Sequence, residues 1–167
     1  MEPDASRTLF DGRLVRVVVE TWGSREREVV RHPGAAGIVA LTSDGEVVLV
    51  RQRREAVRQD LLEIPAGILD VPGEAPADCA RRELVEETGY RAASVSHLAS
   101  ILTSPGFTDE RIELFLARDV APGGEAVEDG VSTVLMPFDD ALAAIRDGRI
   151  LDSKSVTGLL VADPRRR

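Results

Sequence analysis

Cysteine and lysine are almost absent from this sequence of 167 residues, which contains one cysteine, Cys79, and one lysine, Lys154. A lone cysteine excludes an intrachain disulfide, and we expect a reducing, cytoplasmic setting. Long apolar runs are also missing, since none approaches the ~20 residues that cross a bilayer. The segment 1–10 lacks the apolar core of a signal peptide, so we expect no membrane partner.

Positive charge is in deficit, with 21 Lys and Arg against 29 Asp and Glu and a formal net charge of −8. A protein that binds DNA or RNA normally carries a basic patch or stripe, so the composition argues against a nucleic-acid partner. All basic residues except Lys154 are arginine, which we attribute mostly to codon bias. The length suits one domain, large enough to bury a core without disulfides or a structural metal.

Short β-branched runs alternate with a few helical segments, which predicts a mixed α/β or α+β domain. A break at His32-Pro33-Gly34 separates an N-terminal β segment, 1–33, from a larger domain, 34–167. Pro76 and Gly89 mark the two ends of the clearest helix. The expected strands are 14–20, 26–31, 36–42, 46–53, 112–117 and 132–136, and the expected helices are 76–88, 138–147 and 153–162.

The helix expected over 76–88 carries three carboxylates on one side. At 3.6 residues per turn, Glu83, Glu86 and Glu87 share an arc of about 100°. A hard divalent cation would offset their mutual repulsion, and Mg²⁺ is the first candidate because it prefers oxygen ligands. A solvated acidic helix face beside Arg82 is the alternative interpretation when the helix is considered alone.

The residues around this helix form a longer motif. The segment from Gly67 to Glu74 reads Gly-Ile-Leu-Asp-Val-Pro-Gly-Glu, and the segment from Arg82 to Tyr90 reads Arg-Glu-Leu-Val-Glu-Glu-Thr-Gly-Tyr. Together they resemble the Nudix box of Nudix hydrolases, Gly-x5-Glu-x7-Arg-Glu-hydrophobic-x-Glu-Glu-x-Gly-hydrophobic. The match departs at one place, where six residues instead of five separate Gly67 from Glu74. A loop absorbs one added residue without moving the helix, so the motif stands.

Other segments resemble one branch of that family, the ADP-ribose pyrophosphatases. Pro105 follows Tyr90 by 15 residues, the spacing that marks this branch, within the segment 104–110. The segments 50–54 and 62–67 are also similar, so the resemblance covers most of the chain. It implies the Nudix fold, a mixed β-sheet sandwiched between helices, and Mg²⁺-dependent hydrolysis of ADP-ribose to AMP and ribose 5-phosphate.

The resemblance also assigns roles to individual residues. It implies that Mg²⁺, or Mn²⁺ in its place, is held by the Ala66 carbonyl, Glu83, Glu86 and Glu87. The catalytic residues that it implies are Glu128 as the base, Asp129 or Glu86 as alternative bases, and Arg82. The substrate-binding residues that it implies are Arg51, Arg54, Glu63, Gly106, Phe107 and Glu110. Arginine side chains suit the bidentate binding of a diphosphate, and a surface cluster of Arg51 and Arg54 paired with Glu55 and Asp60 is the alternative interpretation.

A homodimer is implied as well, with the segment 1–33 contributing to dimerisation and to the substrate pocket. Trp22 in that segment suits stacking on a purine, but packing in a core or interface is the more common use of a lone tryptophan. Two other functions stay open: hydrolysis of another nucleotide sugar or a dinucleotide, and a non-catalytic sensor that binds ADP-ribose. The complete set of box carboxylates favours the enzyme.

Overall fold

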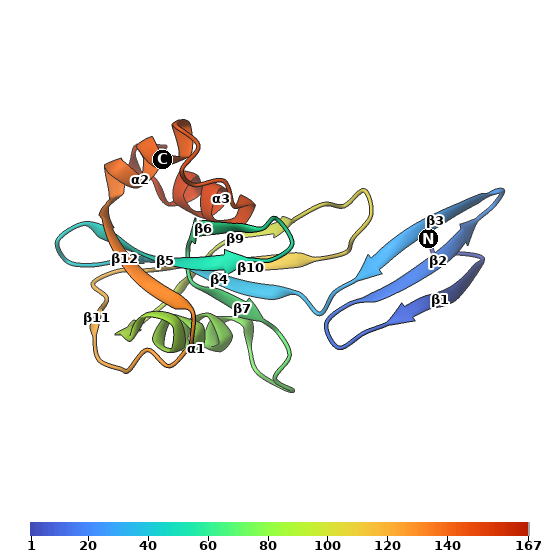
Figure 1. The fold of residues 1–167 in the computed structure, drawn as a ribbon, viewed down its shortest axis with the longest axis horizontal. Coiled ribbons are helices and arrows are strands. Elements are labelled where there is room, and N and C mark those ends of the chain that lie inside the picture. Colours follow the sequence, from blue (N-terminus) through green and yellow to red (C-terminus); the bar gives the residue numbers. More distant parts are fainter. Residues whose placement is uncertain (167) are drawn as a thin grey trace.

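The computed structural model describes residues 1–166 as a mixed α+β domain with a separate N-terminal sheet (Figure 1). The strands are β1 (Ala5–Asp11), β2 (Arg16–Trp22), β3 (Arg25–Arg31), β4 (Ala35–Leu41), β5 (Glu46–Arg54), β6 (Gln59–Glu63), β7 (Ala66–Ile68), β8 (Tyr90–Arg91), β9 (Ser96–Leu102), β10 (Arg111–Ala117), β11 (Ala121–Pro122) and β12 (Val131–Pro137). The helices are α1 (Pro76–Thr88), α2 (Phe138–Arg146) and α3 (Ser153–Ala162), followed by a 3₁₀ turn at Pro164–Arg166. Residue 167, the last of the larger predicted domain, lies outside the described residues.

The central sheet has the strand order β12-β5-β4-β10-β9, with β6 paired to β5 and β7 to β4. Strands β4 and β10 run parallel, and their neighbours pair with them in antiparallel fashion. Strand β4 reads Ala-Ala-Gly-Ile-Val-Ala-Leu and is buried along all but its last residue. A strand that is covered on both faces has no reason to alternate apolar with polar residues, which explains this unbroken apolar run.

Helices cover both faces of the central sheet and divide the core into two layers (Figure 1). Helix α1 packs on one face through Leu84, in a layer that includes Ile38 of β4. Helices α2 and α3 pack on the other face, where Leu142 and Leu159 meet Val39. Neighbouring residues of a strand point to opposite faces, so Ile38 and Val39 belong to different layers. This is the sheet between helices that the resemblance to Nudix hydrolases implies.

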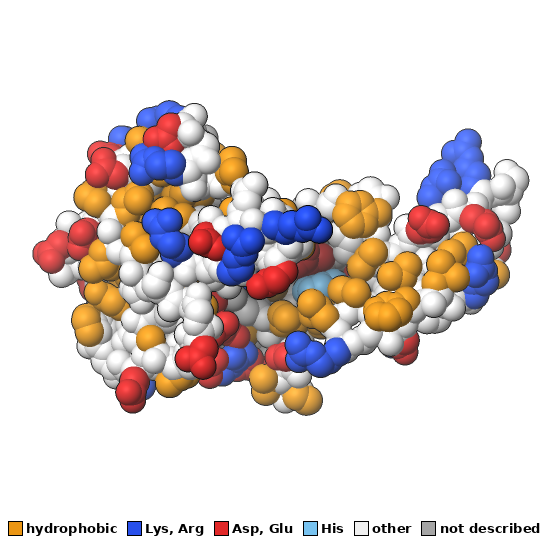
Figure 2. All heavy atoms as spheres, viewed as in Figure 1, with side chains coloured by type: hydrophobic (Ala, Val, Ile, Leu, Met, Phe, Trp, Pro, Cys, Tyr) orange, Lys and Arg blue, Asp and Glu red, His pale blue; other side chains and the backbone are white. Residues whose placement is uncertain are grey.

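Strands β1, β2 and β3 form a separate antiparallel sheet, here called the arm, which projects from the rest of the molecule (Figure 1). The backbone N–H of Val30 donates to the Phe107 carbonyl at 2.8 Å, and Arg31 pairs with Asp109 at 2.8 Å. These contacts fasten the arm to the loop that follows β9. Apolar side chains gather on the visible face of the arm (Figure 2), and Leu9 of β1 is 52% exposed.

The three predicted helices are confirmed, and α1 has the predicted bounds. Gly89 adopts the left-handed conformation (φ 73°), which lets its backbone N–H close the last turn of α1 on the Val85 carbonyl. Strands β1 and β9 and the two-residue strands β8 and β11 were not predicted. In the part of the chain that the structure describes, no helix has the length and apolar character needed to cross a membrane.

Candidate active site

Helix α1 presents its carboxylates to the strand that precedes it. Leu84 packs into the core and fixes the rotation of the helix, so that Glu83 and Glu87 face β7 and are themselves buried. The Glu87 carboxylate accepts a hydrogen bond of 3.1 Å from the backbone N–H of Ala66. Gly67 provides the space for Glu83, because a Cβ atom at this position would lie 1.9 Å from Glu83 Oε1.

The loop between β11 and β12 brings a third carboxylate to this place. The N–H groups of Gly123 and Gly124 donate to the Gly89 carbonyl at 3.0 and 2.9 Å, and that of Glu128 donates to the Glu86 carbonyl at 3.2 Å. Backbone carbonyls at the end of a helix lack partners within the helix, so they are available to anchor a loop. As a result, carboxylate oxygens of Glu83, Glu87 and Glu128 lie within 4.8 Å of one another. These three residues are called the carboxylate group below.

Burial governs the protonation of the carboxylate group. It raises the pKa of Glu87 to about 8, and the negative charges of Glu128 and Glu83 add to this effect. Burial also raises the pKa of Glu83, although the neighbouring guanidinium of Arg82 opposes it. Among residues 1–166 no arginine or lysine forms a salt bridge with Glu87 or Glu128. When all three carboxylates are ionised, the site therefore holds more negative charge than the salt bridges of the protein neutralise.

Arg82 organises the other carboxylates of the motif. Its Nε and Nη2 atoms donate to Glu74 at 2.9 and 3.0 Å, and its Nη1 donates to Glu83 at 2.6 Å and to Glu86 at 2.9 Å. The Glu86 side chain is partly exposed and lies outside the carboxylate group, although the sequence groups it with Glu83 and Glu87. Arg82 thus fixes one oxygen of Glu83 and leaves its other oxygen for a ligand.

The carboxylate group fits a divalent cation. All its donors are hard oxygens, which Mg²⁺ and Mn²⁺ prefer over nitrogen or sulfur. Burying carboxylates without a counter-charge is costly, and a cation at their centre would remove that cost. Glu83 and Glu87 would hold the ion together with the Ala66 carbonyl on the neighbouring strand, and Glu128 would lie beside it.

A cleft opens beside β7 and extends toward the arm. Arg54 lies in it and donates to both oxygens of Glu63, from Nε at 2.8 Å and from Nη2 at 2.6 Å. On another wall, Glu110 accepts from Thr103 Oγ1 at 2.8 Å and lies 3.7 Å from His32 Nδ1. Acidic, basic and histidine side chains lie side by side in this hollow (Figure 2).

The profile of the NUDIX domain family matches residues 31–155. The chain belongs to the Nudix family. A curated relative from Bacillus methanolicus, named methanol dehydrogenase activator, is 39% identical over 157 residues, covering 89% of this chain and 84% of the relative. An ADP-ribose pyrophosphatase from Bacillus subtilis (strain 168) is 34% identical over 160 residues, covering 90% of this chain and 86% of the relative.

A solved structure supports the same fold for this Nudix protein. The crystal structure of an ADP compounds hydrolase matches with a TM-score of 0.79 and 22% identity, covering 96% of this chain and 92% of that chain. Identity this low speaks for the fold alone. The predicted Nudix fold is thus confirmed.

Several predicted site residues of this Nudix protein lie outside the cleft. The Arg51 side chain is exposed on β5, and Asp129 is exposed on the loop beyond Glu128. Gly106 and Phe107 line a different hollow, between the loop after β9 and the arm. The predicted residues that do line the cleft are Arg54, Glu63, Ala66 and Glu110.

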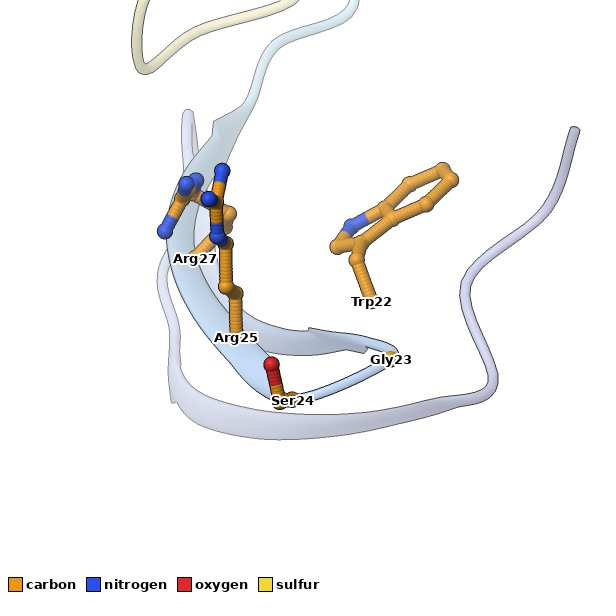
Figure 3. A pocket seen from close by; sticks show the side chains of 5 residues that line it. All are labelled: Trp22, Gly23, Ser24, Arg25 and Arg27. Atoms are coloured by element: carbon orange, nitrogen blue, oxygen red, sulfur yellow. The ribbon is translucent and has the colours of Figure 1, made fainter.

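The structure of this Nudix protein places two residues, Lys154 and Trp22, where the sequence did not predict them. Lys154 lines the cleft and is buried, and its ammonium group contacts Glu63. The sequence offers one signal for it, because it is the only lysine. Trp22 lies outside both core layers, at the tip of the β2–β3 hairpin, where Arg25 and Arg27 stand across a shallow pocket from its ring (Figure 3).

Replacing Gly67 by alanine should weaken cation binding, because the new Cβ would push the Glu83 carboxylate out of the carboxylate group. We expect the Kd for Mn²⁺ to rise at least about tenfold, as displacement of a ligand by an ångström is costly at a fixed site. Electron paramagnetic resonance of free Mn²⁺ measures this change. A melting temperature close to that of the wild type would show that the fold is intact. An unchanged Kd for Mn²⁺ would show that Glu83 is not a ligand of the cation.

Cation binding at pH 7 should release close to one proton, because Glu87 with a pKa of about 8 is mostly protonated before the ion arrives. Calorimetry with Mg²⁺ in buffers of different ionisation enthalpy counts the protons, and the release should vanish well above pH 8. The same shift makes the folded, metal-free chain bind more protons than the unfolded chain. Its free energy of unfolding should therefore fall as the pH rises from about 4.5 to about 8. Heats that do not depend on the buffer at pH 7 would contradict this assignment.

Proposed function

We propose that this chain hydrolyses the diphosphate of ADP-ribose to AMP and ribose 5-phosphate with the help of a divalent cation. The observation that carries the proposal is the carboxylate group against Ala66 and Gly67, two residues that line the cleft where Arg54 lies. Its position in a Nudix domain and the similarity to a relative named ADP-ribose pyrophosphatase support this choice of substrate. We also propose a cytoplasmic location, which the buried free thiol of Cys79 fits.

The proposed ligands of the cation are Glu83, Glu87 and the carbonyl of Ala66, with Glu86 in a supporting role through Arg82. Mg²⁺ is the proposed ion and Mn²⁺ the alternative, as both accept an all-oxygen site. When bound, the cation supplies neutralisation of the diphosphate and a lower pKa for a coordinated water. Arg82 keeps Glu83 in place, because its guanidinium bridges Glu74, Glu83 and Glu86.

The proposed general base is Glu128. It accepts a proton from the attacking water as the water oxygen bonds to one phosphorus, and the bond from that phosphorus to the bridging oxygen breaks. Two products that each carry one phosphate result. Support for Glu128 comes from its oxygens, which lie within reach of Glu83 and Glu87, and from its exposure on a loop. Asp129 and Glu86 are less suitable, because neither belongs to the carboxylate group.

On the substrate side, the Arg54 guanidinium is the proposed partner of the diphosphate, since it is oriented by Glu63 and partly exposed in the cleft. Glu110 is the proposed acceptor for ribose hydroxyl groups. Arg51, Gly106 and Phe107 lie outside the cleft of their own chain, so they are proposed contacts only where a second copy completes the pocket.

We further propose a homodimer formed through residues 1–33, the segment that contains the arm. The support is the exposed apolar surface of the arm, which projects from the domain and carries Leu9 and Phe10 at more than half exposure. Soluble chains rarely leave such surface without a partner.

Substitution of Glu128 by glutamine should lower kcat for ADP-ribose by about 10²–10⁴, the usual contribution of a general base, and leave KM nearly unchanged. The matched control is Glu125→Gln on the same loop, whose side chain lies outside the carboxylate group. Phosphate released by a coupled phosphatase measures the rate, since both products are phosphomonoesters. Equal losses in both variants would contradict the role of Glu128.

A substrate panel in the same assay tests the proposed function itself. We expect the highest kcat/KM for ADP-ribose and no hydrolysis when the cation is chelated. A higher kcat/KM for another nucleotide sugar or a dinucleotide would mean that this compound, not ADP-ribose, is the substrate. Tight ADP-ribose binding without turnover in the presence of Mg²⁺ would favour the sensor.

Sedimentation velocity should give the mass of two chains for the wild type. Replacement of Leu9 by glutamate should shift the protein toward the monomer, because a charge on the contact surface disfavours association. Leu151→Glu is the control, because Leu151 is also exposed and belongs to the segment between α2 and α3 instead of the arm. A monomeric wild type at micromolar concentration would refute the proposed dimer.

A further inference from the structure

Lys154 occupies an unusual position for a basic residue of this chain. Its side chain is only 7% exposed at the start of α3, and its ammonium group donates to Glu63 and, at 2.9 Å, to Asp152 Oδ2. Every other basic residue is an arginine. Burying an ammonium group costs several kcal/mol unless its partners are well placed. The two carboxylates provide that compensation, so this position is built for a charge.

The Glu63 carboxylate lies between Arg54 and Lys154 and contacts both. It is buried to 1% exposure, and both of its oxygens accept hydrogen bonds from Arg54. The oxygen that receives Arg54 Nη2 also receives the ammonium group of Lys154. Burial alone would raise the pKa of Glu63, but the two cations bring it below its usual value. Glu63 is therefore an anion held from two sides.

This arrangement determines which edge of the Arg54 guanidinium is available. Nε and Nη2 are both used by Glu63, so Nη1 is left for a ligand. The Arg54 side chain is 40% exposed and lines the same cleft as Ala66. A guanidinium held at one edge loses little rotational freedom when the other edge binds a phosphate, which favours affinity.

Lys154 balances the charge of the four ionisable side chains that meet at this end of the cleft. Arg54 and Lys154 carry two positive charges, and Glu63 and Asp152 carry two negative charges. Removing the ammonium group would leave one excess negative charge below a cleft that is proposed to receive a diphosphate. It would also leave Arg54 as the single cation that holds Glu63.

We propose that Lys154 is a positioning residue for substrate binding: it locks Glu63, and Glu63 in turn presents Nη1 of Arg54 to the diphosphate of the substrate. This inference rests on the proposed function and extends it to a residue that does not itself contact the diphosphate. A compact ammonium group suits the narrow space between two carboxylates, whereas a guanidinium is wider and planar.

The test begins with Lys154→Met, which keeps much of the volume of the side chain and removes the charge. We expect KM for ADP-ribose to rise at least about tenfold at saturating Mg²⁺ and kcat to change less than about threefold, the signature of lost binding. Arg54→Ala should raise KM at least as much. The double variant should resemble Arg54→Ala, because two residues that act through one contact are not additive. Independent, multiplied effects would overturn the proposal.

Ser155→Ala is the matched control for local destabilisation. The Ser155 hydroxyl accepts from the Ile64 N–H at 2.8 Å and donates to Asp152 at 2.6 Å, but it makes no hydrogen bond to Glu63 or Arg54. We expect this variant to melt at a lower temperature with KM unchanged. A rise in KM equal to that of Lys154→Met would reduce Lys154 to a structural role.

A crystal structure of Lys154→Met tests, without any substrate, whether Lys154 keeps Glu63 and Arg54 in place. We expect Glu63 or the Arg54 guanidinium to be displaced, and unchanged contacts between them would overturn the proposal. Failure of the wild type to hydrolyse ADP-ribose would refute the proposed function instead.

If Lys154→Met does not fold, the double variant Lys154→Met with Glu63→Gln removes both charges together. That double variant should show the same rise in KM, and an unchanged KM would overturn the proposal.

Discussion

The burial of acidic side chains at the junction of α1 and β7 is the constraint on which the rest of this structure depends. Glu83 and Glu87 sit in the place of core residues, one turn apart on a helix whose adjacent face packs on the sheet. Their charges oppose burial, so the surrounding backbone has to be arranged around them. The Ala66 N–H points at Glu87, Gly67 makes room for Glu83, and Arg82 fixes one side. A site that is costly for the free protein is one that a cation stabilises.

The same junction explains how distant segments reach one place. The end of α1 offers unpaired carbonyl groups, and the loop before β12 binds to two of them, at Glu86 and Gly89. The loop therefore carries Glu128 to the carboxylate group by backbone contacts that do not depend on its own side chains. The left-handed turn at Gly89 is needed for this, because it turns the chain away and leaves the carbonyls accessible. One helix terminus thus serves both as a cap and as an anchor.

Local signals made part of this predictable from the sequence. Pro76 and Gly89 define α1 by their own backbone preferences, and the helical repeat places Glu83 and Glu87 together. Other features depend on contacts between distant segments. Glu86 has the same spacing, yet its pairing with Arg82 keeps it apart, and Glu128 joins the group through the tertiary fold. Strand β1 escaped prediction because all its residues are exposed, so it shows no apolar alternation.

The net charge of −8 and an anionic substrate are compatible once the positions of the charges are known. Part of the excess acid lies in the carboxylate group, where a divalent cation would convert it into a site for phosphate. In the cleft, the Glu63 carboxylate pairs with two cations, Arg54 and Lys154. Each buried carboxylate near the cleft is thus paired with a cation of its own or is available to a metal. The acidity of the chain then determines where cations gather, and these cations, not the net charge, determine what the cleft can bind.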